Sequence, residues 1–138
     1  MLFLGTAPAW AVLGENESSV SLDQQVLRSQ DSVQAFQAYK VHQLTSANGA
    51  IVREYISAEG TVFGISWQGP FVPNLQQLLG SYLTDLQQGQ VTQHMRRCAI
   101  TIQTDNFVFS SVGHLRFFRG RAYVPGLVPA NLTPEVVQ

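Results

Sequence analysis

Residues 51–70, IVREYISAEGTVFGISWQGP, are the stretch that decides the fold. Apolar and polar residues alternate on both sides of Glu59-Gly60, a pair typical of tight turns between antiparallel strands. Just upstream, Asn48-Gly49 is the strongest short hairpin signal, because both central positions of a type I′ turn need φ > 0. The sequence therefore predicts three strands joined as an antiparallel meander.

Two-residue loops at both turns would fix how these strands pair. Val52 then faces Thr45, and Glu54 faces Ile65. One face is apolar and is expected to pack on the core; it carries Tyr39, Val41, Val52, Ile56, Phe63, Ile65 and Trp67. The other face carries Lys40, His42, Arg53, Tyr55 and Ser66. A three-residue second loop would slip the register by one residue and turn Arg53 inward instead.

Glu54 lies in the middle of the predicted core face. A buried carboxylate must be paired, hydrogen-bonded or neutralised, because an isolated ion is costly in a low-dielectric interior. We expect its partner to be an arginine of the basic C-terminal part, preferably Arg116, which lies in a strand-like run. A register-fixing ion pair is favoured over a catalytic acid. Structural roles are expected for Glu54, Trp67, Gly49 and Gly60.

Outside the meander, periodicity predicts helices and further strands. Residues 22–36 have apolar side chains at helical spacing, and a second helix begins at the N-cap Asn74 and ends at Gly89. Alternation predicts strand segments at 98–102, 107–111, 115–118 and 121–124, and the prolines beyond them preclude regular structure. The predicted fold class is α+β, with an antiparallel sheet of about five or six strands and one or two helices on one face.

Residues 1–11, MLFLGTAPAWA, indicate export. They carry no charge and end in Ala9-Trp10-Ala11, the small-x-small pattern that a signal peptidase recognises. The basic n-region is absent and the apolar run is short, as expected if the signal begins upstream of Met1. We expect residues 12–138 to form a single periplasmic or secreted domain. No stretch approaches the ~20 apolar residues of a membrane span.

The charge of the chain is low and unevenly distributed. Charged residues make up 12% of it, against roughly 25% in average globular proteins. Residues 12–89 hold seven acids and three bases, whereas residues 90–138 hold five bases and two acids. Arginines alternate with aromatic residues between Arg116 and Tyr123, an arrangement that could stack on bases. The net charge of −1 and the single lysine argue against nucleic acid as the partner.

No catalytic or metal motif stands out. Cys98 is the sole cysteine and lies in an apolar alternation, which favours a buried inert thiol. In a strand, His94 and Cys98 would be roughly 13 Å apart, too far to share a metal ion. Ser110 and Ser111 lie near His114, but no nucleophile elbow accompanies them. The sequence therefore predicts no metal and no cofactor.

An ordered set of short motifs runs along the chain: Val52-Arg53-Glu54-Tyr55, Gly60-Thr61-Val62-Phe63, Trp67-x-Gly69-Pro70, Leu78-Leu79-Gly80-x-Tyr82, Ser111-x-Gly113-His114-x-Arg116 and Gly120-Arg121-Ala122-Tyr123. This set resembles the domain-of-unknown-function family numbered 2844, whose members are small exported proteins of Gram-negative bacteria. The chain departs from the pattern at Val112, where similar sequences tend to have glycine. The resemblance implies export and a shared fold, but no activity, cofactor or catalytic residue.

We therefore expect a non-enzymatic module of the cell envelope that binds a protein or another envelope component. Its binding surface would be the solvent-facing side of the sheet and the arginine-bearing loops. The candidate binding residues are Arg53, Tyr55, Arg116, Arg119 and Arg121. One alternative is a small periplasmic hydrolase that uses Glu54 with His114, and another is a purely structural envelope protein. The sequence leaves the ligand and the oligomeric state open.

Overall fold

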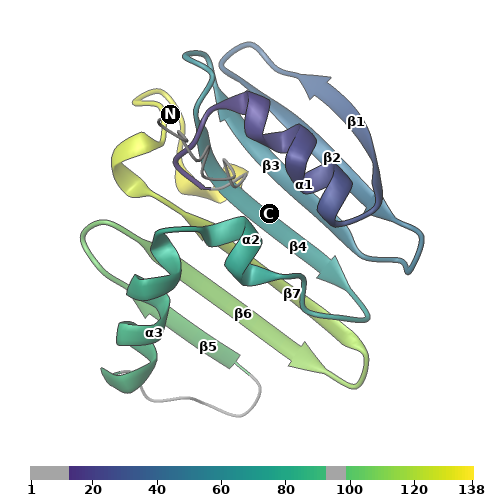
Figure 1. Cartoon of the computed structure of the whole chain (residues 1–138). Coiled ribbons are helices and arrows are strands. Elements are labelled where there is room, and N and C mark those ends of the chain that lie inside the picture. Colours follow the sequence, from purple (N-terminus) through teal and green to yellow (C-terminus); the bar gives the residue numbers. More distant parts are fainter. Residues whose placement is uncertain (1–12, 93–98) are drawn as a thin grey trace, which may run out of the picture.

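The computed structural model describes residues 13–92 and 99–138. Within these ranges seven antiparallel strands form one sheet in the order β1-β2-β3-β4-β7-β6-β5 (Figure 1). The strands are β1 (Ser29–Ala35), β2 (Tyr39–Ser46), β3 (Ile51–Ser57), β4 (Val62–Gly69), β5 (Ala99–Gln103), β6 (Val108–His114) and β7 (Phe117–Tyr123). The α+β class is confirmed, and the sheet has more strands than predicted.

Three short α-helices and three 3₁₀ turns accompany the sheet in the described part of the chain. They are η1 (Glu17–Ser19), α1 (Val20–Val26), α2 (Leu75–Leu79), α3 (Tyr82–Thr92), η2 (Pro125–Leu127) and η3 (Pro134–Val136). Figure 1 shows the α-helices on one side of the sheet. We call this side the helix face and the opposite side the tail face.

The loop between β2 and β3 has three residues rather than the predicted two. The Ser46 N–H donates to the Ala50 carbonyl at 2.9 Å, and Gly49, with a φ of 91°, closes the turn. The predicted register is therefore wrong by one residue, and Val52 faces Leu44. Because of this slip, the β2 side chains point to the faces opposite to those predicted. Leu44, His42 and Lys40 lie on the helix face, whereas Tyr39 and Val41 lie on the tail face.

The loop after Ser57 also has three residues and is closed by Gly60, whose φ is 87°. By itself, a three-residue loop would shift the pairing of β3 with β4 by one residue from the predicted register. A β-bulge adds Phe63 to β4 and cancels the slip, so Glu54 faces Ile65 as predicted. Because the bulge absorbs one residue, Phe63 joins the tail face instead of the predicted core face.

The main core lies between the helices and the helix face. Trp67 is central to it, as predicted, and its ring lies 5.5 Å from that of Phe109. Gly120 of β7 lies directly beneath Trp67. A side chain at this position would collide with the indole, so the close approach requires glycine. Other buried members are Leu44, Val52, Ile56, Ile65, Leu78, Leu79, Ile102, Phe107 and Ala122.

The segment after β7 packs on the tail face and builds a second, smaller core. Its buried anchor is Val137, which packs with Tyr55 and Phe63. Gly64 makes room for this anchor, since a β-carbon there would lie 2.5 Å from Val137 Cγ2. Partly buried residues around them are Tyr39, Val41, Tyr123, Leu127, Val128, Leu132 and Val136. The proline-rich tail thus covers one end of the sheet.

The helix predicted over residues 22–36 is wrong in its second half. Helix α1 ends at Val26, Arg28 takes a left-handed φ of 47°, and the chain continues as strand β1. After Ser29 every residue of β1 is exposed, so the apolar side chains that suggested a helix, such as Val33, are not buried against the core. Pairing with β2 satisfies the backbone instead.

The helix predicted from Asn74 begins where expected but is interrupted. Asn74 Oδ1 accepts a hydrogen bond from the Gln77 backbone N–H at 3.2 Å, which confirms the N-cap. Gly80, with a φ of 52°, then separates α2 from α3. Helix α3 runs past Gly89 to Thr92, so the predicted stop is wrong.

Two sets of sequence-based predictions lie outside the described residues. The predicted signal peptide covers residues 1–11, and His94 and Cys98, for which a shared metal ion was considered, lie within 93–98. Among the helices of the described ranges, none combines the length and the apolar character needed to cross a bilayer.

Candidate functional site

Three of the predicted binding residues, Arg53, Arg119 and Arg121, line one cavity of about 500 Å³ on the tail face. Arg53 of β3 pairs with Ser66 of β4, and Ser66 pairs with Arg121 of β7. Because cross-strand partners point to the same face, Arg53 and Arg121 flank the buried Ser66. The cavity is also lined by Gln68, Ala99, Thr101, Ser110, Val112, Glu135 and Gln138.

A second hollow of about 600 Å³ adjoins the first and shares Arg53, Gln68, Arg119 and Gln138 with it. It reaches across β3 and β2 to β1, and its lining on that side includes Ser32, Gln34, Phe36, Tyr39, Gln43 and Tyr55. The rings of Phe36 and Tyr39 stack at 4.7 Å. We call the two hollows together the arginine groove; it extends from β1 to β5.

Two of the three guanidinium groups of the groove are held by neutral partners. Arg53 Nε donates to Gln43 Oε1 at 3.1 Å. Arg121 donates to the Val137 carbonyl at 3.2 Å, and its guanidinium lies 5.6 Å from the centre of the Tyr123 ring. Among the described residues, no carboxylate lies within 4.0 Å of Arg53, Arg119 or Arg121. Glu135 lines the same cavity; hydrogen bonds with Thr133 and its own backbone lower its pKa, and the charge of Arg121 adds to this. Among the described lining residues, three arginines thus stand against this one acidic side chain, and the groove carries a positive charge.

Of the other two predicted binding residues, Tyr55 lines the second hollow and Arg116 lines neither. Tyr55 is buried beneath the tail, where its hydroxyl donates to the Gln138 carbonyl at 2.9 Å and accepts from the Gln138 N–H at 3.1 Å. Ser66 Oγ donates to the same carbonyl at 2.6 Å. Arg116 lies in the turn between β6 and β7 and is exposed. Tyr55 thus fixes the tail that borders the groove and also lines the second hollow.

Glu54 is buried on the helix face, but the expected arginine partner is wrong. Arg116 lies at the far end of β6 and β7, and the group beside Glu54 is another acid, Asp23 of α1. Gln77 of α2 completes this buried acid pair, because its Nε2 donates to Asp23 Oδ1 at 2.8 Å. The cluster ties two helices to the centre of β3.

The two buried carboxyl groups of Glu54 and Asp23 lie side by side because they share a proton. In the described part of the chain, neither Glu54 oxygen nor Asp23 Oδ2 meets an N–H or hydroxyl donor. Burial raises the pKa of Glu54 well above its usual value, and Asp23 beside it raises it further. Burial also raises the pKa of Asp23, although the hydrogen bond from Glu54 opposes this. Glu54 therefore keeps its proton and donates it to Asp23.

A separate polar network covers the outer side of this region. His42 Nδ1 lies 2.7 Å from Asp31 Oδ2, and His42 Nε2 lies 3.0 Å from Glu17 Oε1. Both contacts are hydrogen bonds only in the imidazolium form, because a neutral ring donates from one nitrogen. Lys40 Nζ contacts both Glu17 oxygens at 2.8 and 2.9 Å. The hydrogen bonds from Lys40 and then His42 lower the pKa of Glu17.

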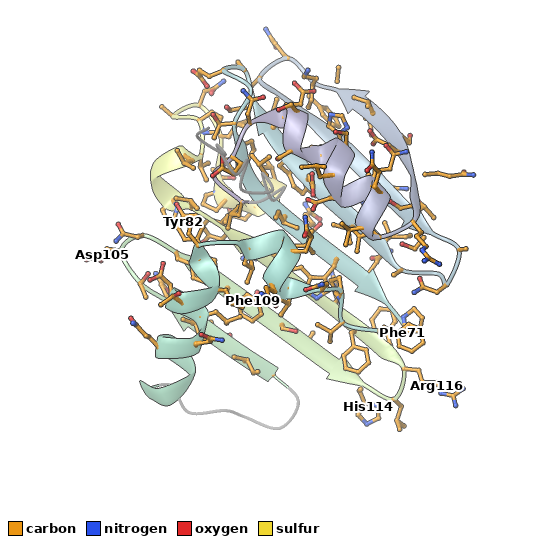
Figure 2. The ribbon with its side chains drawn as sticks, viewed as in Figure 1. Phe71, Tyr82, Asp105, Phe109, His114 and Arg116 are labelled. Atoms are coloured by element: carbon orange, nitrogen blue, oxygen red, sulfur yellow. The ribbon has the colours of Figure 1, made fainter. Side chains whose placement is uncertain are left out.

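The structure does not assemble Glu54 and His114 into a catalytic pair. Across the sheet, Glu54 of β3 is aligned with Phe109 of β6, which lies three strands away. His114 lies a further five residues along β6 from Phe109. At about 4.8 Å per strand and about 3.3 Å per residue, the separation is roughly 20 Å. Figure 2 shows His114 at an outer corner of the sheet. The histidine opposite Glu54 is His42.

Sequence reasoning missed Asp23, Gln77 and His42 as members of buried polar clusters. One signal was available for Asp23, which falls three residues after Val20 and four before Leu27. Helical spacing alone places it on the buried stripe of α1. His42 was assigned to the solvent face because of the assumed two-residue loop, and the three-residue loop turns it toward α1.

These features define a small α+β protein with an antiparallel sheet, helices on one face, and a tail and an arginine groove on the other. Residues 9–137 match the family described as "Protein of unknown function (DUF2844)", and the chain belongs to that family. Neither a curated protein nor a solved structure was found to match it.

Proposed function

We propose that this protein is an exported, non-enzymatic binding module that holds an anionic component of the cell envelope in the arginine groove. The observation that carries the proposal is the convergence of Arg53, Arg119 and Arg121 on one cavity, where the single acidic side chain among the described lining residues, Glu135, forms no ion pair with them. Such a cluster of cations lowers the free energy of a bound anion.

The lining chemistry supports ligands that carry carboxylate or phosphate groups. A planar guanidinium donates two parallel hydrogen bonds to either group, which gives both affinity and orientation. Glutamine, serine and threonine side chains surround the arginines and offer neutral hydrogen bonds to hydroxyl or amide groups of the same ligand. The groove spans the sheet from β1 to β5, so an extended chain fits it better than a compact ion.

Binding to soluble polyanions tests this proposal. The probes are polygalacturonate for carboxylates and polyphosphate for phosphates, with neutral dextran as the negative probe. Arg119→Gln should weaken binding of the preferred polyanion by about tenfold, since a hydrogen bond to a charged group contributes roughly 1.5–3 kcal/mol. Arg28→Gln is the matched control, because Arg28 is exposed, precedes β1 and lines neither hollow of the groove.

The enzymatic alternative gives a different pattern. Glu54→Gln and His114→Ala should leave polyanion capture unchanged, whereas a hydrolase using both would lose turnover. The proposal fails if neither polyanion binds, if dextran binds as well as they do, or if Arg28→Gln weakens binding as much as Arg119→Gln.

A further inference from the structure

The turn between β6 and β7 presents large apolar side chains to solvent. Leu115 is 85% exposed and Phe117 is 57% exposed. Phe71 lies just beyond the end of β4, is 58% exposed and occupies the same corner, since Gly69 pairs with Phe118. Figure 2 shows Phe71, His114 and Arg116 together at this corner. We call Phe71, Val72, Leu115, Arg116 and Phe117 the apolar corner.

The backbone of the turn is strained by the residues it carries. His114 pairs with Phe117, so Leu115 and Arg116 form a two-residue loop, with φ values of 39° and 66°. Such type I′ loops favour Asn-Gly, because side chains other than those of Asn, Asp and Gly are disfavoured at positive φ. Leu115 is therefore unfavourable in two ways: leucine is disfavoured at this positive φ, and its apolar side chain is exposed to water. Strain of this kind concentrates at functional positions.

The charge around the apolar corner is positive. Arg116 is in the turn itself, and Arg119 follows on the same strand. The acids nearest in sequence are Asp105, at the opposite end of β6, and Glu135, in the tail. Figure 2 shows Asp105 on the other side of the molecule from Arg116. The corner therefore combines protruding apolar side chains with the charge of Arg116, and Arg119 of the neighbouring groove lies three residues further along β7.

We propose that the apolar corner docks onto an anionic lipid surface, with Leu115 and Phe117 entering the interfacial region and Arg116 contacting lipid phosphates. A protruding apolar tip flanked by cations suits a shallow bilayer contact. It is too small for a stable protein interface, which engages about 20–30 residues on each side. The inference concerns a different surface from the arginine groove and does not rest on the function proposed for that groove.

Replacing both residues of the turn, which we call the turn exchange, distinguishes an effect on docking from an effect on folding. Leu115→Asn combined with Arg116→Gly installs the residues that a type I′ loop favours, so the variant should melt at a higher temperature than the wild type. The same exchange removes the tip leucine and one cation. We expect it to weaken co-sedimentation with vesicles of phosphatidylglycerol and phosphatidylethanolamine by at least about tenfold. The wild-type chain should bind pure phosphatidylcholine vesicles far less.

Val33→Asn serves as the control, because Val33 is 54% exposed on β1, at the other edge of the sheet from β5 and β6. It should leave vesicle binding unchanged, and the turn exchange should leave polyanion binding in the groove unchanged. The proposal is overturned if the wild type does not bind anionic vesicles, or if the turn exchange binds them equally well. Photo-crosslinking from position 115 to a protein, without vesicle binding, would also overturn it in favour of a protein partner.

Discussion

Replacing Glu54 with glutamine should stabilise the protein, and the gain should grow as the pH rises. The buried acid pair keeps a proton in the folded state at pH values where the unfolded chain has lost it, because burial raises the pKa of Glu54 well above its usual value. Folding must then take up a proton, so stability falls as the pH rises from the unfolded pKa toward the folded pKa. Glutamine is neutral and has no such dependence.

The size of the effect follows from the proton count. One extra proton bound in the folded state costs about 1.4 kcal/mol per pH unit within that window. For 138 residues, an unfolding entropy of about 2.1 cal/mol/K per residue converts this to roughly 5 °C in Tm per pH unit. Glu17 contributes in the opposite sense, because its pKa is lowered. Its stabilisation is complete above its unfolded pKa of about 4.3, so it is constant above pH ~5.5.

The assay is the thermal midpoint of wild type and Glu54→Gln at pH values from 5.5 to 8. The quantity of interest is the difference between the two proteins, since every titrating group other than Glu54 is common to both. Glu59→Gln is the control, because Glu59 is exposed in the β3–β4 turn. The reasoning is refuted if wild type and Glu54→Gln change in parallel across this range, or if Glu59→Gln diverges from wild type to the same extent.

Other substitutions test the packing of the tail and the helix cap. Gly64→Ala should cost about 1–3 kcal/mol in urea unfolding because the new methyl group meets Val137, whereas Gly126→Ala, with no atom within 4 Å, should have a far smaller effect. Asn74→Ala should cost about 1 kcal/mol through loss of the N-cap, measured in the same way; an unchanged midpoint would contradict the cap. Tyr55→Phe should free the tail and speed its proteolysis, and unchanged cleavage would show that the hydroxyl does not hold it.

The sequence predicted most strands but not the loops that join them. A glycine at positive φ closes two-residue and three-residue hairpin loops alike, so Asn48-Gly49 does not distinguish the two. The first loop was misjudged, and His42 changed faces as a result. The second was misjudged as well, yet Glu54 was placed correctly because the bulge at Phe63 restores the register. A bulge depends on packing on both faces of β4, which local sequence does not reveal.

The candidate groove was predictable in part. Arg119 and Arg121 are two residues apart in a strand, so they share a face, and Arg53 was assigned to the solvent face from its alternation with Glu54. Their convergence depends on β4 lying between β3 and β7, a long-range pairing that no local pattern encodes. The acid pair was unpredictable for the same reason, because it needs α1 to cross β3.

The neighbouring residues Arg53 and Glu54 link the core to the groove. They point to opposite faces of β3, so the register that buries Glu54 beneath α1 also aims Arg53 into the groove. A slip by one residue would bury the guanidinium without a partner and place a carboxylate beside Arg121, which would cancel part of the groove's positive charge. The protonated Glu54 fits the core only in the native register, because only there does it meet Asp23. The buried acid pair on one face therefore helps to define the charge of the arginine groove on the other.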